Sequence, residues 1–547
     1  MPSAHRNRKF LTILLSVIVG TVVLFYIGRY VLYTEIRKAI ARELTDLSEK
    51  GINIQYDHID VKPFSGKIQF YNLRAQLGTD TISGLTCVIP HLLIKGIKIL
   101  PYLEDKTLSI GSIDLHDAVI NYTSGSKLIE EDTSSKKKIV LRNIMVNEIK
   151  LPGIRLCLKD TLGKDTVVYL HGQLAIHGLG LERHQDSLTW QEAEIQFQDI
   201  NLRFPKEYYG ATIKNFRIAL AEKSITLDSA IIKPFYSRKL FMKKNGREID
   251  YIAGVVPYVD LKDVNWYTYP SLSVDIESIK LQFFLRVFRD KRYPFIKDKN
   301  TILPSHFLQQ LPIQLMIDTI QLKESYVSYE EFPAQGDSSG AVVFDQLHAT
   351  IIKVHNNPEL KEPILMQAYS RFMNTGDLHV SFSFPYDVSK PYTVSGSLQK
   401  FPLNGLNSMV GAAAKLKIES GVMTNLKFDY RYTMLNSTGM IELNYEDLKI
   451  SSLREDKDGN QAISPIKTLL LNAFIKKDMN KDVNADKRTG EISFYRDTKR
   501  SIFNYWWKSV FSGLKAAYNL DKLPSKKEVS ARKAAKKKRK EMRTAMR

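Results

Sequence analysis

A serine flanked by glycines is the first feature of the sequence that could do chemistry. Residues 336–340 read Gly-Asp-Ser-Ser-Gly, which matches the Gly-x-Ser-x-Gly pattern of hydrolases that use a serine nucleophile. That chemistry needs a strand before the serine and a helix after it. Here Pro333 lies just before the motif, and the strand-like residues 341–344 follow it. The sequence therefore predicts a flexible loop at this position.

Charged residues nearby offer two other kinds of chemistry. Glu330 and Glu331 are adjacent carboxylates, but no acid–base partner can be identified for them, which favours a solvated strand end. Residues 289–292 read Arg-Asp-Lys-Arg and form a compact charged turn. This turn could touch lipid head groups, although a surface cluster of ion pairs is the favoured interpretation.

The usual signatures of enzymes and metal sites are missing from the sequence. It has no Gly-x-Gly-x-x-Gly, P-loop or His-Glu-x-x-His motif, and its 11 histidines are scattered. Cys87 and Cys157 have no partners at metal-ligand spacing and allow at most one disulfide, so two buried cysteines on strands are favoured, and whether they pair stays open. We expect no catalytic residues, no metal and no cofactor.

The positive charge is concentrated at the C-terminal end. The 547 residues carry a formal charge of +20, and residues 521–547 hold 12 basic and 3 acidic residues, or +9. The rest of the chain is only mildly basic, so we expect no nucleic-acid partner. The basic tail is interpreted either as attracted to anionic lipid or as a solubilising tail.

A long uncharged stretch near the N-terminus predicts a membrane anchor. Residues 10–27 contain no charge, the stretch remains compatible with a membrane to residue 33, and Arg6, Arg8 and Lys9 precede it. The positive-inside rule places residues 1–9 in the cytoplasm. A cleaved signal peptide is the alternative, but no Ala-x-Ala-like site follows. Everything after residue 33 would then lie outside the cytoplasm.

After the anchor the periodicity changes from helical to strand-like. Ile36, Ile40, Leu44 and Leu47 share helical spacing, whereas from residue 51 onward apolar and polar residues alternate with a period of two. Such alternation is typical of an antiparallel sheet with one apolar and one wet face. The predicted segments are a helical stalk (34–50), two β regions (51–255 and 256–450), a loop with a short helix or strand (451–500), an amphipathic helix (501–520) and a basic tail (521–547).

Two patterns recur along the β regions. The first is apolar, any, Asn/Asp/Gln, apolar, any, apolar, and its Asn, Asp or Gln is expected to make a side-chain to backbone hydrogen bond at a bulge or bend. In the second, residues 110–122 match residues 317–329 at most positions, and each copy predicts a strand, a short turn and a strand. The first pattern occupies residues 70–75, 141–146, 197–202, 213–218, 261–266 and 344–349. Together they predict a repeated strand module.

These features give the chain a resemblance to a known family. The anchor, residues 52–77 with their Pro63-Phe64 turn, the Ile-x-Ser/Thr-Ile-x-Leu strands and the segments 403–407, 418–421, 438–439 and 445–448 resemble the AsmA-like proteins of the bacterial envelope. The resemblance implies an inner-membrane anchor and an elongated, taco-like β-groove in the periplasm, distantly related to chorein-type, bridge-like lipid transfer proteins. It also implies a role in phospholipid movement and outer-membrane biogenesis. At 547 residues the chain is short for a continuous bridge.

The expected function is therefore phospholipid binding or transfer, with apolar strand faces shielding acyl chains. A non-enzymatic envelope scaffold that binds protein partners through closed β-sandwiches is the alternative, because alternation alone permits either an open groove or a closed sandwich. The groove candidates are Val380, Phe382, Phe384, Leu426, Phe428, Tyr430, Tyr432, Ile441 and Leu443. On the C-terminal helix, either a membrane-interface face or a cap on the sheet is expected, with the candidates Phe503, Trp506, Trp507, Val510 and Leu514.

Overall fold

The computed structural model describes most of the chain between residues 52 and 517. Within that range it leaves out residues 78–84, 99–106, 124–142, 160–165, 185–186, 191–193, 205–207, 268–271, 297–299, 358, 456–460 and 464–487, and before it only scattered positions between 33 and 48 are described. The predicted N-terminus (1–9), nearly all of the predicted anchor (10–33) and the predicted tail (521–547) lie outside the described residues. None of the helices that are described has the length and apolar character needed to cross a membrane.

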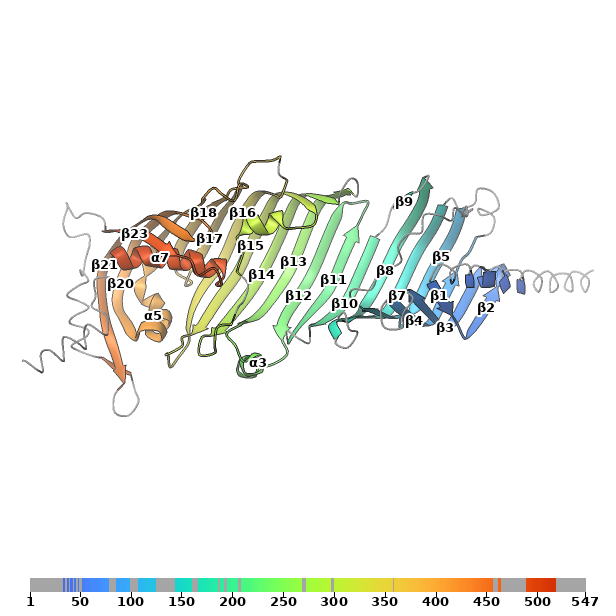
Figure 1. Ribbon diagram of the computed structural model, residues 1–547, viewed down its shortest axis with the longest axis horizontal. Helices are drawn as coiled ribbons and strands as arrows, with labels where there is room; N and C mark the ends of the chain where they lie inside the picture. The colour runs from blue at the N-terminus through green and yellow to red at the C-terminus, as the bar shows by residue number, and fades with distance from the viewer. Residues whose placement is uncertain are drawn as a thin grey trace, which may run out of the picture. The chain divides into compact units, whose positions relative to one another are not determined.

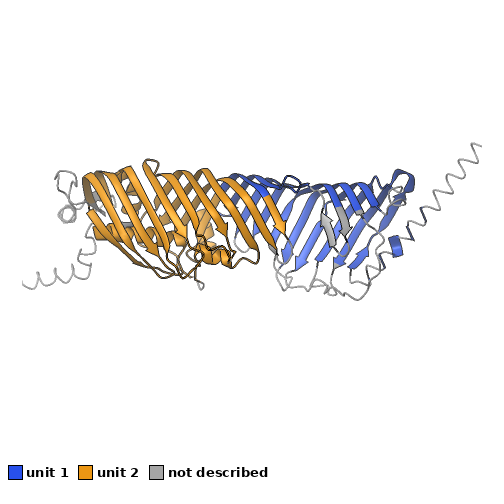
Figure 2. Ribbon diagram, turned by 90° about the horizontal axis from the view of Figure 1, so that it is seen from above, with its two compact units in different colours: residues 1–236, 255–263 blue, residues 237–254, 264–547 orange. Residues whose placement is uncertain are grey.

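The protein is mainly β, as the alternation predicts, and its strands divide between two compact units (Figures 1 and 2). Unit 1 comprises residues 1–236 and 255–263, and unit 2 comprises residues 237–254 and 264–547. The strands of unit 1 are β1 (Ile52–Gln55), β2 (His58–Lys62), β3 (Lys67–Leu77), β4 (Leu85–Lys95), β5 (Thr107–His116), β6 (Val119–Thr123), β7 (Asn143–Lys159), β8 (Thr166–His184), β9 (Ser187–Trp190), β10 (Glu194–Phe204), β11 (Tyr209–Ala219) and β12 (Ser224–Pro234), with the 3-10 turn η1 (Pro63–Ser65).

Strand β13 (Asp250–Tyr267) contributes residues to both units. The other elements of unit 2 are α3 (Arg238–Asn245), β14 (Ser273–Asp290), α4 (Pro304–Gln309), β15 (Gln314–Phe332), β16 (Gly340–His355), β17 (Ile364–Phe372), β18 (Gly376–Phe384), β19 (Tyr392–Pro402), η2 (Leu403–Leu406), α5 (Asn407–Ala414), β20 (Leu416–Tyr432), β21 (Asn436–Glu455), β22 (Gln461–Ile463), β23 (Arg488–Tyr495) and α7 (Ile502–Ala517). Helix α7 falls within the segment for which an amphipathic helix is predicted.

The sheet is mixed, so the prediction of a wholly antiparallel sheet is wrong. Most neighbours pair antiparallel, including β8 with β10, β10 with β11 and β11 with β12. However, β7 pairs parallel with both β5 and β6, and β14 pairs parallel with β15. A parallel pair needs a crossover connection instead of a tight hairpin. In unit 2 that connection contains α4.

The central residue of the first repeated pattern is left-handed in four of the six copies, and the predicted bulge or bend is confirmed by a shift of register at two of them, Asp199 and Gln346. Asn72, Asp199, Asp263 and Gln346 adopt φ values of 50°, 51°, 50° and 46°, in the left-handed region that Asn and Asp tolerate better than most residues. The pairing of β10 with β8 shifts register around Asp199. The predicted side-chain to backbone bond is not what Asn72 makes, because its Nδ2 donates to Asp57 Oδ2 at 2.8 Å.

The second repeated pattern lies at the two parallel junctions. Asp117 and Glu324, at equivalent positions in the two copies, have φ values of 54° and 46°, and the next residues, Ala118 and Ser325, are 1% and 0% exposed. The predicted strand, short turn and strand are confirmed in the first copy, where Asp117 is a turn residue between β5 and β6, but are wrong in the second copy, where Glu324 lies inside β15. The turn at Asp117 does not reverse the chain, because β5 and β6 pair in the same directions with β4 and β7. A left-handed residue here makes an irregularity within a ladder instead of reversing the chain.

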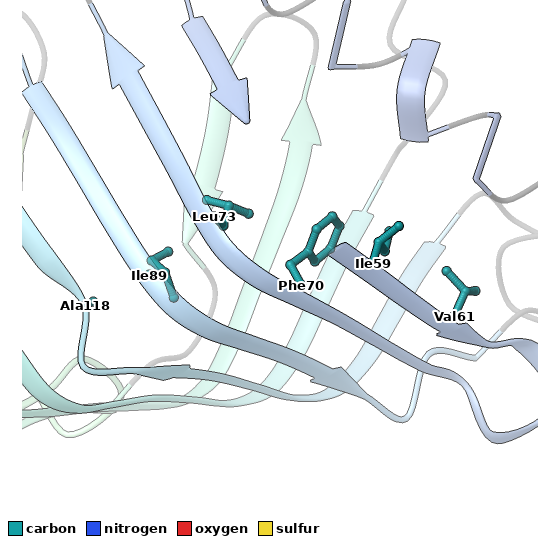
Figure 3. Packing of buried hydrophobic residues seen from close by; sticks show 6 residues of the cluster. All are labelled: Ile59, Val61, Phe70, Leu73, Ile89 and Ala118. Atoms are coloured by element: carbon teal, nitrogen blue, oxygen red, sulfur yellow. The ribbon is translucent and has the colours of Figure 1, made fainter. Parts of the chain in front are cut away.

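The core at the start of unit 1 lies on one side of its sheet. Ile59, Phe70 and Leu73 point to the same side of their strands (Figure 3), and they cluster there with Val61, Ile89 and Ala118. Ile40, from the predicted stalk, packs against this cluster. The stalk residues that the structure describes are helical. At Ile40, one of the apolar residues with helical spacing, this helix therefore packs against the sheet.

The two cysteines are free and partly buried. In the ladders, Cys87 of β4 is opposite Ile120 of β6, whereas Cys157 of β7 is opposite Asn121. Successive residues of a strand point to opposite faces, so the two thiols lie on opposite faces of the sheet and on either side of β6. This placement rules out a disulfide between them.

Candidate functional site

Five strands of unit 1 present a continuous apolar face. In register across β7, β8, β10, β11 and β12, one row consists of Ile149, Ile176, Ile195, Ile218 and Ile225. The adjacent row consists of Leu151, Leu174, Phe197, Phe216 and Leu227. Strand alternation places both rows on the same side of the sheet, because their members are two residues apart along each strand.

The bulges keep this face apolar along the length of the strands. Beyond the left-handed Asp199, Ile200 returns to the apolar side, where it pairs with Ile213 of β11. Ile200 lies over Gly172 of β8, where a Cβ atom would come within 2.5 Å of Ile200 Cδ1. The missing side chain of Gly172 therefore leaves the space that Ile200 fills, and Ile200 is 4% exposed.

The opposite face of the same strands is polar. Arg217 of β11 donates from Nε to Glu194 Oε1 of β10 at 2.8 Å and from Nη2 to Glu194 Oε2 at 3.1 Å, and it also binds Glu222. The hydrogen bonds from Arg217 lower the pKa of Glu194 to about 2. The ion pairs lie at the surface, where each stabilises the fold only modestly. The two faces therefore differ sharply in polarity.

The apolar rows of unit 1 are only partly buried. Their isoleucine, leucine and phenylalanine side chains have intermediate exposure, and the main packing partners of β10 and β11 among the described residues are neighbouring strands. At one end of the row, Ile149 and Ile176 pack against the buried residues Ile110, Val146 and Leu179. By contrast, fully covered apolar residues elsewhere in the protein are less than a tenth exposed. Apolar surface of this extent that stays partly exposed among the described residues is typical of a binding surface.

The predicted groove residues of unit 2 come together on one face but are covered. The pairing register places all nine on the same side of β18, β20 and β21. Tyr430, Tyr432, Ile441 and Leu443 are 2%, 1%, 0% and 0% exposed, Leu426, Phe428 and Phe384 are also buried, and Val380 and Phe382 are partly exposed. Helix α7 packs against β21 and β23 (Figure 1). The contact of these side chains with acyl chains stays a prediction, and their observed partners belong to the protein.

The face that α7 turns to the sheet consists largely of small residues. Tyr505, Ser509, Gly513 and Ala517, four residues apart, are its buried positions. Ser509 Oγ lies 2.7 Å from Ser437 Oγ of β21, and a Cβ at Gly513 would lie 2.7 Å from Ile492 Cγ1 of β23. The small side chains allow the helix backbone to approach the sheet closely.

The predicted membrane-interface residues occupy the rest of α7. Phe503 and Trp507 are 71% and 37% exposed, and Val510 and Leu514 are partly exposed. Trp506 contacts the sheet, with its ring 4.6 Å from that of Phe382. The helix therefore both covers part of the sheet and presents two large apolar side chains outward. A membrane role for them stays a prediction.

The charged turn of unit 2 is a cluster of ion pairs, which confirms the favoured interpretation. Arg289 binds Asp250 through two hydrogen bonds of 2.7 and 2.6 Å. Arg292 pairs with Asp290 at 2.7 Å, and Lys291 pairs with Glu331 at 2.6 Å. The carboxylate of Glu331 is thus paired with Lys291 just beyond the end of β14, and it also accepts a hydrogen bond from Tyr329 Oη at 2.9 Å.

The Gly-x-Ser-x-Gly segment is a loop, as predicted. It connects β15 to β16, which begins at Gly340, so a strand follows the serines instead of the helix that a nucleophile elbow requires. Ser339 Oγ donates to Glu330 Oε1 at 2.6 Å. The described residues hold no group of three or more metal-ligating side chains.

The sequence pattern did not identify the apolar face of unit 1 as a candidate binding site. Period-two alternation is present at residues 143–159 and 194–234, but it resembles the alternation of ordinary core strands. Only the absence of a covering element distinguishes the two. In comparisons with known proteins, no family model matches the sequence and no curated protein matches it significantly.

Proposed function

We propose that this protein binds phospholipid and handles it at a membrane, with the apolar face of β7–β12 in unit 1 shielding acyl chains from water. The observation that carries the proposal is the double row of partly exposed apolar side chains on five adjacent strands. The predicted anchor at residues 10–33 and the likeness to AsmA-like envelope proteins extend the proposal to an inner-membrane-anchored, periplasmic protein that supports outer-membrane biogenesis.

The physical basis is the burial of hydrocarbon on hydrocarbon. Each acyl CH2 group removed from water contributes about 0.8 kcal/mol, so contact with a few carbons of a chain would offset much of the cost of ordering it. Strands lie about 4.8 Å apart, and a row over five strands is therefore roughly 19 Å across. A face of that width can contact an acyl chain along much of its length.

The apolar face would recognise a phospholipid through its acyl chains and not through ionic contacts with its head group. The rows contain only aliphatic and aromatic side chains, and the ionic side chains of the same strands, such as Glu194 and Arg217, lie on the other face. The head group would remain in water at the side of the face. Such a surface selects for an apolar chain but discriminates little between head groups.

Site-specific photocrosslinking in the full-length protein tests the proposal. A benzophenone amino acid is placed at Phe216, on the apolar face, or at Arg217, the next residue and on the opposite face. In cells whose phospholipids carry labelled phosphate, we expect irradiation to attach lipid to the protein at position 216 but not at position 217. A third position, Ile441, is 0% exposed beneath α7 and is expected to remain unlabelled.

Equal labelling at positions 216 and 217, or no labelling at either, would contradict the proposal. Attachment of another protein at position 216 in place of lipid would instead favour the scaffold function, in which the apolar face binds an envelope protein. The paired positions control for expression and for general proximity to the membrane, because both lie on β11.

A further inference from the structure

Helix α3 of unit 2 presents a cationic outer surface. The helix lies outside the sheet, at the ends of the strands (Figure 1). With 3.6 residues per turn, one side of the helix consists of a leucine and three lysines and is continued by an arginine just after the helix. All five residues of this outer surface are exposed: Lys239, Leu240, Lys243, Lys244 and Arg247. The sequence from residue 238 to residue 247 holds five cations and no carboxylate.

The inner side of α3 fixes the helix to unit 2. Phe241 is 0% exposed and packs edge-on against Tyr251, with the ring centroids 5.3 Å apart. Arg238 Nη1 donates to Glu330 Oε2 at 2.7 Å, and its guanidinium lies 4.8 Å from the centre of the Phe288 ring. These contacts determine which side of the helix is presented outward.

The fold does not need the charges of the outer surface. Lys239 and Lys243 are four residues apart, where like charges on a helix repel each other. Lys239 also lies in the first turn, where the positive end of the helix dipole disfavours a cation. The next carboxylate along the chain, Glu248, is buried and pairs with Arg500. Cations that cost the fold stability indicate a surface that binds an anionic partner.

We propose that the outer surface of α3 docks on a membrane of anionic phospholipid, with its cations beside the head groups and Leu240 inserted between them. Leu240 is 41% exposed, although lysines surround it. An apolar side chain presented among cations is typical of helices that lie at a membrane surface. The proposal goes beyond the shielding of acyl chains in unit 1, because it concerns a membrane surface and holds equally if unit 1 binds a protein.

The small size of the outer surface favours a membrane over a protein partner. A stable protein interface covers about 800 Å² on each partner, which one helix of eight residues does not offer. Attraction to an anionic membrane needs no such area, because each basic residue near the membrane strengthens the association about fivefold. A membrane also takes up Leu240 at the boundary between head groups and acyl chains, whereas a nucleic-acid backbone would leave it in water.

Photocrosslinking in the full-length protein tests the proposal. A benzophenone amino acid replaces either Leu240 or Met440, which is the matched control because it is 50% exposed but has Asp429 and Glu491 as cross-strand neighbours. The protein is reconstituted into vesicles of phosphatidylcholine, alone or mixed with phosphatidylglycerol. We expect lipid to be attached at position 240 in vesicles with phosphatidylglycerol, and this attachment to be lost at high salt, which screens exposed charges. We expect no attachment at position 440.

Lysine substitutions show whether the charges act. Lys239→Gln combined with Lys243→Gln should reduce the attachment at position 240 by up to about 30-fold, since each lysine contributes about fivefold. Lys390→Gln combined with Lys427→Gln is the control, because both lysines are exposed in unit 2 outside α3, and it should leave the attachment unchanged. All variants keep residues 521–547, so the attraction of the basic tail to the vesicles is the same in each. Circular dichroism checks that these surface variants fold.

Three results would overturn the proposal: equal attachment at positions 240 and 440, equal attachment with and without phosphatidylglycerol, or no effect of the substitutions at Lys239 and Lys243. The same crosslinker at position 240 in cells distinguishes the partners. Attachment of phospholipid supports membrane docking, whereas attachment of an acidic protein or a nucleic acid overturns it. A failure at position 240 leaves the acyl-chain proposal intact, because that proposal is tested at positions 216 and 217.

Discussion

Truncating one isoleucine on the covered face and one on the uncovered face should have very different costs. Ile441 of β21 is 0% exposed, whereas Ile218 of β11 is partly exposed. Replacing isoleucine by alanine removes three carbons, which is about 2.4 kcal/mol of transfer free energy at full burial. Beneath α7 the change also leaves a cavity, which adds roughly 1–2 kcal/mol. We therefore expect Ile441→Ala to lower the free energy of unfolding by about 4 kcal/mol.

Ile218→Ala should lower the free energy of unfolding by only about 1 kcal/mol. Roughly half of the transfer free energy applies to a partly exposed side chain, and no cavity forms where the space is open to water. The assay is urea unfolding of lipid-free protein, followed by far-UV circular dichroism and by tryptophan fluorescence, which reports on unit 1 through Trp190 and on unit 2 through Trp266, Trp506 and Trp507. Equal losses for the two variants would refute the reasoning, because they would show that the face at Ile218 is as well covered as the face beneath α7.

Three further predictions follow from local geometry. Gly513→Ala in α7 should lower the free energy of unfolding by about 1–3 kcal/mol because the new Cβ would overpack the contact with the sheet. Gly411→Ala in α5 is the control, since its new Cβ would have no contact closer than 3.7 Å. Because alanine favours a helix over glycine, this control variant should raise the Tm. Glu194 has a folded-state pKa of about 2, below its unfolded value, so its contribution to stability is present above about pH 4.5 and is lost as the pH falls toward 2; Glu194→Gln, like Arg217→Gln, should flatten the dependence of Tm on pH in this window. Asp199→Val should cost about 1–2 kcal/mol in urea unfolding because φ is 51°, while Asp199→Gly should change little.

Alternation in the sequence was enough to predict a mainly β protein whose strands have one apolar face. Phe428 and Tyr430 indeed lie on the same side as Ile441. The sequence could not show which stretch of that face is covered. Helix α7 packs against the sheet through small residues such as Gly513, whereas the large apolar residues of the helix, which are prominent in the sequence, lie on a different face. Helical periodicity indicates which face of a helix carries apolar side chains, but it does not indicate where the backbone of the helix packs closely against a sheet.

The sequence also did not predict whether neighbouring strands pair parallel or antiparallel. A strand, its left-handed residue and the next strand have the same local pattern whether the chain reverses or continues. The pattern therefore predicts a turn at both Asp117 and Glu324, although only Asp117 lies in one, and it does not give the direction of the next strand. A bulge or bend is predictable at Asn72 and Asp199 because a polar residue interrupts the apolar alternation there, but their left-handed φ values are not. Whether β14 and β15 pair parallel depends on the crossover connection between them. That connection does not change the alternation of apolar and polar residues within either strand, so the sequence of the strands does not reveal it.

Pairing between sequence neighbours has a consequence for how the chain acquires its structure. In unit 1, β10 pairs with β11 and β11 with β12, so each new strand finds its partner in the segment that has just formed. Such local contacts favour fast, progressive folding, and the sheet can lengthen as the chain emerges from its N-terminal end. Helix α7 follows the described strands of unit 2 in the chain, so the aromatic surface around Tyr432 stays uncovered until α7 has been synthesised and has packed. During that interval the surface is exposed to aggregation.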